Sequence, residues 1–213
     1  MADSNGLSIH DRPNSYIGRS VPRPNLSRLL KGRGSYADDV KLPRMVHVAF
    51  LRSPLAHADI VKIETDKASS ASGVIAVYNG KDLAKVCSPW VGVVTHLEGM
   101  RSPPQNLLAV DRVRWQGEPV VAVVAQTRAL AEDAIELIEV KYKELPLAVD
   151  MKTALDDDTE VIHKEYENNL CWERNVNAGD VDAAFAEADV IVEEEFQFGR
   201  HTGVTLESRS IVA

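Results

Sequence analysis

The chain of 213 residues carries 24 basic and 32 acidic side chains, so its formal net charge is −8. This balance argues against a nucleic-acid-binding protein, because phosphate neutralisation needs a basic surface. A hydrophobic content of 45% excludes extended disorder and supplies enough apolar side chains for a sizeable core. The longest strongly apolar run, residues 120–125, is far too short to span a bilayer.

The N-terminus has no basic region followed by an apolar stretch, so it gives no secretory signal. Cys87 and Cys171 form no CxxC pair and no disulfide framework. We therefore expect a cytoplasmic protein in which each cysteine is a small buried apolar residue. Residues 1–17 are polar and lack a sustained period, which predicts a mobile tail.

Prolines and small-residue turns in residues 21–43 predict an extended segment on the surface. Residues 45–53 then alternate as a strand, with Val46, Val48 and Phe50 on one face. The pattern that follows predicts a second strand, a short helix closed by a glycine, and a buried strand, over residues 58–66, 66–72 and 74–80.

Residues 86–104 have no clear period and contain three prolines, so we expect a loop. Loops of this length in compact domains are often functional or contact another chain. A short strand over 112–117 follows the loop.

The next elements have the clearest periodicity in the chain. The continuous β-branched run of residues 118–126 predicts a strand covered on both faces. Residues 127–138 predict a helix with Thr127 as its N-cap, and residues 139–146 alternate as a strand. A strand, a helix and a strand within so short a stretch predict a βαβ unit.

The polar stretch of residues 151–177 resembles a linker more than a core. After it, residues 179–188 predict a helix capped by Asp180, with Val181 and Phe185 facing inward. Residues 189–199 predict an alternating strand, and a further strand is expected over 205–213. Because one helix and two strands cannot enclose a core, we expect an incomplete second domain from residue 178 onward.

Common catalytic motifs are absent from the sequence. There is no GxSxG nucleophile elbow, no GxxxxGK[ST] and no GxGxxG after a strand. The six histidines make no HxxxH metal pair. We therefore assign no catalytic, cofactor-binding or metal-binding residue to this chain.

Five polar residues have structural interpretations that outweigh functional ones. His47 is expected to be a partly exposed strand residue, and His57 a hydrogen-bonded structural residue rather than a ligand. Capping of the adjacent turn is favoured over metal binding for Asp38 and Asp39. Glu207 lies near two arginines, and pairing with one of them is favoured over a direct role in a site.

Several blocks of the sequence resemble one known family. GRSVPRPNLSRLLKGRGSYADD, RSPLAHADIVKIET, VRWQGEPVVAVVA and AEDAIELIEVKYKELP occur in that family's order. Residues 18–150 resemble the α/β-hammerhead domain that opens the molybdenum-binding large subunit of the xanthine dehydrogenase and aldehyde oxidase family. Residues 178–213 resemble the first part of the molybdopterin-binding domain that follows. The resemblance implies an α+β fold with a linker over residues 151–177.

The same resemblance implies oxidation of a C–H centre with oxygen supplied by water. Molybdenum on a pterin, in bacteria often a cytosine dinucleotide, would do the chemistry in the rest of the large subunit. Electrons would pass through [2Fe–2S] clusters on a small subunit to FAD on a medium subunit. The absence of CxxC here agrees with that division. A dimer of multi-subunit units is implied, with no nucleic acid and no membrane.

The family's glycine-rich pterin segments and its catalytic glutamate do not occur in this sequence. Glu207 matches a family glutamate beside the early strands of the pterin domain, but this does not make it catalytic. The leading hypothesis is therefore a scaffold and subunit-contact part of a molybdenum hydroxylase, inactive alone. The loop 86–104, with Trp90 and Met100, is the candidate contact surface. The alternative is a stand-alone binding or assembly module without redox chemistry.

Overall fold

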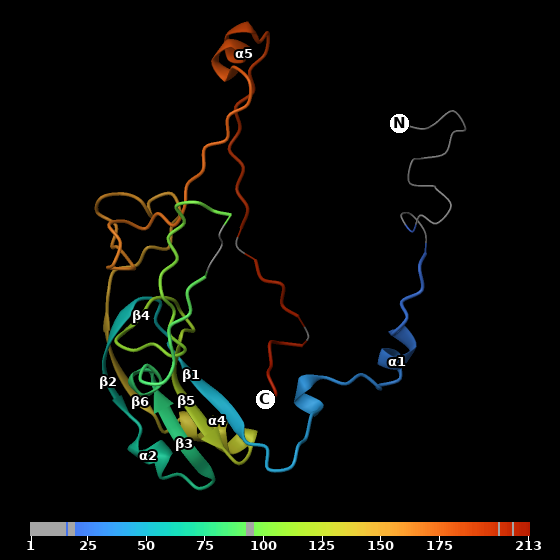
Figure 1. Cartoon of the computed structure of the whole chain (residues 1–213), viewed down its shortest axis with the longest axis vertical. Helices are drawn as coiled ribbons and strands as arrows, with labels where there is room; N and C mark the ends of the chain where they lie inside the picture. Colours follow the sequence, from blue (N-terminus) through green and yellow to red (C-terminus); the bar gives the residue numbers. More distant parts are fainter. Residues whose placement is uncertain (1–15, 17–19, 93–95, 200, 206) are drawn as a thin grey trace. The chain divides into compact units, whose positions relative to one another are not determined.

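The computed structural model describes Tyr16 and residues 20–92, 96–199, 201–205 and 207–213 (Figure 1). The chain divides into two compact units, Arg44–Glu194 and a second made of Met1–Pro43 with Glu195–Ala213. Apart from Tyr16, the predicted mobile tail lies outside the described residues.

The first sheet of the larger unit has three antiparallel strands in the order β1-β5-β3. β5 (Pro119–Ala125) lies in the centre, between β1 (His47–Arg52) and β3 (Val74–Asn79). Both edges of β5 are therefore hydrogen-bonded, and four consecutive residues from Val120 to Val123 are buried. This confirms that the β-branched run forms a covered strand.

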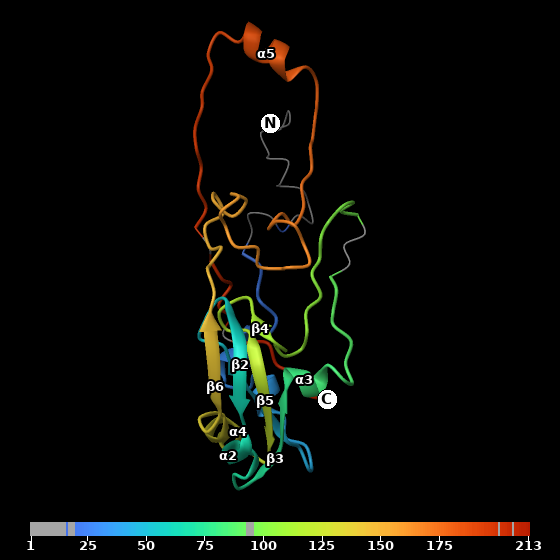
Figure 2. The same cartoon turned by 90° about the vertical axis from the view of Figure 1, so that its left-hand side faces the viewer.

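The second sheet has the order β4-β2-β6 and is also antiparallel. Its central strand is β2 (Ala58–Glu64), with the short β4 (Arg112–Val113) on one side and β6 (Glu139–Glu144) on the other (Figure 2). Ala58 and its partner Val113 are both fully buried, so this sheet contributes to the same core as the first.

The helix α4 (Arg128–Ile135) packs on β1 and β5 and covers the first sheet. Its N-cap is Thr127, whose hydroxyl oxygen accepts a hydrogen bond from the backbone N–H of Leu130 at 3.3 Å, as the sequence predicts. Ala131 and Ala134 face the sheet and are buried, because small side chains let the helix approach the strands closely. Leu137, which lies just beyond the end of the helix, is 41% exposed.

The predicted βαβ unit is wrong. β5 and β6 belong to different sheets, and every strand pair in the described part of the chain is antiparallel. Two physical reasons account for this. Both edges of β5 are already occupied, and a helix of eight residues rises only about 12 Å, too little to return along a seven-residue strand of about 23 Å.

The outer face of β1 is apolar but lies in solvent. Val48 and Phe50 are 51% and 45% exposed, while Ala49 and Leu51 of the opposite face pack against the core. Val48 and Phe50 therefore share one face of β1, as expected. That face is exposed, and the opposite face of the strand is the one that packs against the core.

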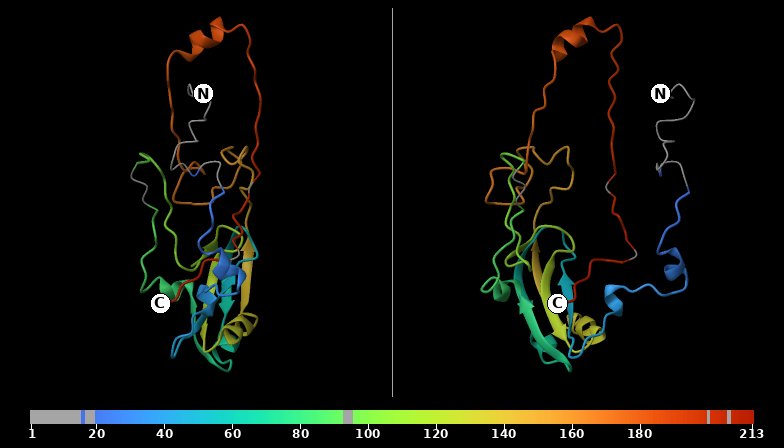
Figure 3. Two further views of the ribbon diagram at one scale, coloured as in Figure 1. Left: turned by 90° about the vertical axis from the view of Figure 1, so that its right-hand side faces the viewer. Right: turned by 45° about the vertical axis from the view of Figure 1, so that its right-hand side comes forward.

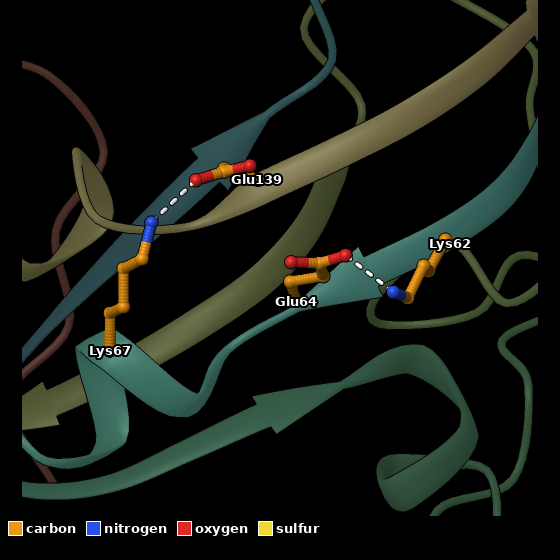
Figure 4. Close-up of polar contacts among 4 residues, drawn as sticks. All are labelled: Lys62, Glu64, Lys67 and Glu139. Atoms are coloured by element: carbon orange, nitrogen blue, oxygen red, sulfur yellow. Dashed lines mark hydrogen bonds and ion pairs between the residues drawn. The ribbon is translucent and has the colours of Figure 1, made fainter.

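Two ion pairs lie at one end of the second sheet (Figure 4). Lys62 pairs with Glu64 two residues along β2, so both side chains lie on one face of the strand. Lys67, in the short helix α2 (Asp66–Ser69), pairs at 2.8 Å with Glu139 at the start of β6. All four side chains are at least half exposed, so these pairs add little to stability.

In the smaller unit, residues expected to be extended form two short turns of helix. These are α1 (Leu26–Leu30) and a 3₁₀ helix (Ala37–Asp39). The carboxylate of Asp39 accepts a hydrogen bond from the backbone N–H of Tyr36 at 3.0 Å, which confirms capping as its role. Glu207 Oε1 accepts from the N–H of Ala37 at 3.0 Å, so the partner described for this carboxylate is a backbone amide and not an arginine.

The helix predicted near the C-terminal end is confirmed as α5 (Val181–Glu187), and Asp180 caps it by accepting from the N–H of Ala183. Its inward face is not confirmed, since Val181 and Phe185 are more than half exposed. The strands predicted after it are wrong for the described residues, which form coil (Figure 3). A strand needs a hydrogen-bonding neighbour, and the described residues offer none here. Among the described residues, no helix is long and apolar enough to cross a membrane.

Burial of β5 leads to a stability prediction. Val123→Ala should lower the free energy of unfolding by about 2 kcal/mol, because two methyl groups leave a fully buried site and a cavity remains. Val48→Ala, on the exposed face of the neighbouring strand, should cost less than about 0.5 kcal/mol. Urea unfolding of the two variants checks this, and equal losses would contradict the assigned core.

Candidate functional site

The loop that the sequence singles out leaves the first sheet at α3 (Gly80–Leu83). Asn79 caps this helix through Oδ1, which accepts from the N–H groups of Lys81 and Asp82. A Cβ on Gly80 would lie 2.1 Å from the carbonyl oxygen of Ala109, so only glycine fits. The start of the loop is therefore fixed to the strand β3 and to the backbone near residue 109.

A pair of backbone hydrogen bonds closes the neck of the loop. Trp90 and Gln105 each donate an N–H to the carbonyl of the other at 2.8 Å. The indole of Trp90 remains 63% exposed, while Met100 further along is half-buried. The loop thus presents a large aromatic side chain from a fixed backbone position, which is a favourable arrangement for a contact surface.

The returning limb of the loop, residues 96–105, is braced against residues 151–172, which we call the bracing segment. Arg101 makes most of the contacts. Its N–H donates to the carbonyl of Cys171 at 2.8 Å, its Nη1 donates to Asn168 Oδ1 at 2.9 Å, and its guanidinium lies 5.8 Å from the ring centroid of Tyr166. Trp172 Nε1 adds a bond to the carbonyl of Glu98 at 3.2 Å.

Asn169 organises the bracing segment from within. Its Nδ2 donates to the carbonyls of Ala154 and Glu160, both at 3.0 Å, and its Oδ1 accepts from the N–H of Ile162 at 3.0 Å. One half-buried amide therefore joins the turn at Ala154 to residues 160–162. This gives a stretch without helix or strand a defined conformation.

A small hollow lies beside the neck of the loop, lined by Leu83, Cys87 and Leu107 among others. Its volume of about 10 Å³ has room for roughly one water molecule. It is far too small to hold an organic cofactor.

A polar row lies on the second sheet, on the face opposite Ala58 and Val113. Arg112, which is 7% exposed, donates from Nε to Asp59 Oδ1 at 2.7 Å and from Nη2 to the same oxygen at 2.6 Å. The hydrogen bond from Arg112 is the main reason that the pKa of Asp59 lies below its usual value. Nearby, desolvation raises the pKa of Glu118, although it accepts a hydrogen bond from the N–H of Arg114.

The histidines behave largely as the sequence predicts. His47 is half-buried on β1. His57 is 2% exposed, and its Nδ1 lies 2.7 Å from the carbonyl oxygen of Pro146, so this nitrogen donates and the role is structural. His10 lies outside the described residues.

The expectation that both cysteines are buried is wrong. Cys87 is half-buried beside the neck of the loop, and Cys171 is exposed, with its Sγ donating to the carbonyl of Arg101 at 3.3 Å. Isolated cysteines are usually buried, but here the loops that carry them lie at the surface.

The contacts made by Arg101 could not be predicted from the sequence. They join segments far apart in the chain, and neither segment has a period that could indicate a partner. The Asp59–Arg112 pair was in principle detectable, since opposite charges stand at matching positions of two predicted strands. Within the described ranges, no group of three or more His, Cys, Asp or Glu side chains could hold a metal ion.

Comparison with known proteins defines the class of the fold. Residues 31–146 match the family described as aldehyde oxidase and xanthine dehydrogenase, a/b hammerhead domain. Residues 162–213 match the molybdopterin cofactor-binding domain. The larger unit therefore contains an α/β-hammerhead domain. The chain belongs to the aldehyde oxidase and xanthine dehydrogenase family, which confirms both the resemblance and the α+β fold class.

Curated relatives agree with this assignment. The chain is 37% identical over 197 residues to the nicotine 6-hydroxylase large subunit of Paenarthrobacter nicotinovorans, covering 92% of this chain and 24% of that protein. It is 34% identical over 200 residues to the carbon monoxide dehydrogenase large chain of Afipia carboxidovorans, covering 87% and 24%. The chain thus spans about a quarter of the length of these relatives.

Solved structures show the same fold. Quinoline 2-oxidoreductase from Pseudomonas putida 86 superposes with a TM-score of 0.66 at 42% identity, over 73% of this chain and 20% of that one. Aldehyde oxidoreductase from Desulfovibrio gigas gives a TM-score of 0.69 at 28% identity, over 79% and 19%.

Removal of the Arg101 side chain should loosen the bracing segment. Arg101→Ala loses the bond to Asn168 and the contact with Tyr166, worth together about 1–2 kcal/mol, so the segment should open about tenfold more often. Limited proteolysis should then cut residues 151–172 about tenfold faster. Arg174→Ala, at an exposed position just beyond the segment, is the matched control and should leave the rate unchanged. Equal cleavage of both variants would show that Arg101 does not hold the segment.

The Asp59–Arg112 pair predicts acid sensitivity of a defined sign. Because the folded-state pKa of Asp59 is lowered, its contribution to stability is present above the unfolded pKa of about 3.9 and is lost as pH falls through the folded value. Asp59→Asn should therefore flatten the acid limb of the stability curve, measured by urea unfolding at decreasing pH. Asp111→Asn, an exposed neighbour, should retain the slope of the parent.

Proposed function

We propose that the chain is a scaffold and subunit-contact part of the large subunit of a molybdenum hydroxylase, without catalytic residues of its own. The observation that carries this is the exposed Trp90, held on a loop whose neck and returning limb are both fixed. A surface meant only for solvent would not need an aromatic residue at a braced position.

The family supports the chemical part of the proposal. The relatives include a nicotine 6-hydroxylase large subunit and carbon monoxide dehydrogenase large chains, and both names describe subunits of larger oxidoreductases. We propose that molybdenum on a pterin, as a cytosine dinucleotide, is bound by the rest of the large subunit. We further propose that [2Fe–2S] and FAD subunits complete a cytoplasmic dimer of multi-subunit units.

The described residues do not by themselves fit a molybdopterin site. The hollow beside the loop has room for about one water, and the described residues matched to the molybdopterin cofactor-binding domain form coil and one exposed helix. The chain's domain boundaries at residues 18–150, 151–177 and 178–213 remain predictions.

A stand-alone binding or assembly module is the alternative function. The exposed apolar face of β1 favours it, because Val48 and Phe50 could contact a partner of any kind.

Native mass spectrometry with metal analysis on the protein from its own source separates the two functions. The scaffold proposal expects the sequence in an assembly that contains molybdenum, iron and flavin. A stable species of 23.4 kDa free of these groups would support the binding module instead.

The contact loop gives a testable mutation. Trp90→Ala should weaken association with partner subunits by about tenfold or more, because truncating a central aromatic residue of an interface typically costs about 2 kcal/mol. Thermal unfolding of the isolated chain should be unchanged. Trp115→Ala, at an exposed tryptophan outside the loop, is the control and should leave co-purification intact. If the Trp90→Ala variant co-purifies with partner subunits as well as the parent does, the loop is not part of the interface.

A further inference from the structure

The outer face of the first sheet is apolar across all three of its strands. In the register of the sheet, two residues of each strand point to this side and form two adjacent rows. The six side chains, which we call the apolar strip, are Val48, Phe50, Ala76, Tyr78, Ala122 and Val124. None of them is charged, and the three largest are 42–51% exposed.

The second sheet shows how a solvated face of the same domain is built. On β6, Val140 and Tyr142 pack against the core, whereas Lys141 and Lys143 between and beside them are exposed. An antiparallel sheet with one face in water normally alternates in this way, with apolar residues inward and polar residues outward. The strand β1 departs from this pattern because both of its faces are apolar. A sheet with two apolar faces is typical of a middle layer, with a further layer packed on its outer side.

One cation lies at the end of the apolar strip. The guanidinium of Arg52 lies 5.9 Å from the ring centroid of Phe50, and its Nη1 donates to the carbonyl of Gly117 at 2.9 Å. These two contacts hold the charge beside the strip. Within the described part of the chain, no carboxylate forms an ion pair with Arg52. The guanidinium therefore has donors left for a carboxylate that comes from outside the chain.

The length of the relatives and the charge of the strip indicate what covers it. The chain spans 24% of the nicotine 6-hydroxylase large subunit and 24% of the carbon monoxide dehydrogenase large chain, so most of each relative lies outside the matched region. A second copy of this chain fits less well. The strip contains no carboxylate, so two facing strips would bury Arg52 of each copy without an opposite charge.

We propose that the apolar strip is a docking surface for a further part of the large subunit, which packs apolar side chains on it and places a carboxylate against Arg52. This inference rests on the proposed function, because it needs the chain to be part of such a subunit. It assigns a second contact surface, on a different element from the loop that carries Trp90.

Hydroxyl-radical footprinting of the assembly from its own source, compared with the isolated chain, tests the docking. The radicals oxidise exposed aromatic side chains, and Phe50 and Tyr78 are 45% and 42% exposed in the chain alone. Burial to about a tenth or less should slow their oxidation about fourfold in the assembly. Lys141 and Lys143 on the solvated face of β6 are the matched control, and an amine reagent should label them equally in both samples.

Variants of Arg52 test the carboxylate. Arg52→Glu sets a like charge against it, so the oxidation of Phe50 and Tyr78 in the assembly should return to the rate of the isolated chain. Arg52→Lys keeps the positive charge and should keep most of the protection. Lys62→Glu, an equal reversal of charge at an exposed position of β2, should leave the protection unchanged.

Equal oxidation of Phe50 and Tyr78 in the assembly and in the isolated chain would overturn the proposal, and this result needs no variant. Protection that is already present in the isolated chain, with the mass of a dimer in sedimentation, would also overturn it and assign the strip to a second copy. An equal loss of labelling at Lys141 would overturn it as well, because the shielding would not then be selective for the strip.

Oxidation of Trp90 in the same samples separates the two proposals. A protected Trp90 with an oxidised strip contradicts only the docking of the strip, whereas an oxidised Trp90 with a protected strip contradicts only the contact of the loop. A chain that purifies without larger polypeptides contradicts both.

Discussion

Burial of β5 between β1 and β3 is the constraint on which the larger unit depends. Because both of its edges are paired, its valines can be covered on both faces, and α4 closes the inner side with alanines. Because both edges of β5 are paired, β6 cannot join the first sheet beside it and instead pairs with β2 in the second sheet. The two-sheet architecture thus follows from one strand that has no free edge.

That architecture positions the loop of residues 86–104. The loop begins where Gly80 touches the backbone of Ala109, and it returns against a segment that Asn169 has already organised. Neither limb relies on regular secondary structure. Their defined conformation comes from side chains that satisfy backbone groups, of which Arg101 is the central one. A surface of defined conformation can therefore be built from polar loops, so the proposed scaffold function does not need helix or strand at this place.

Local periodicity predicted most strands and both capped helices, since the signals of Thr127 and Asp180 lie within one turn of the helices that they begin. It failed where the outcome depends on distant partners. The βαβ prediction was wrong because both edges of β5 are hydrogen-bonded to β1 and β3. The strands expected after α5 did not form because they have no neighbouring strand among the described residues. The contacts of Arg101 were missed for the same reason, because they join segments that meet only in the fold. The resemblance to the family came from the order of several blocks, which physical patterns alone do not reveal.

The outer face of the first sheet bears on how the chain behaves in solution. Phe50 and Tyr78 flank Ala122 from opposite sides, so an apolar strip crosses three strands, and Val48 lies two residues before Phe50 on the same face of β1. The side chains of Val48, Phe50 and Tyr78 are each about half exposed. Salts that are excluded from protein surfaces, such as sulfates, strengthen the association of such strips. Solubility of the chain should therefore decline as these salts are added, even though its net charge of −8 keeps molecules apart at low ionic strength.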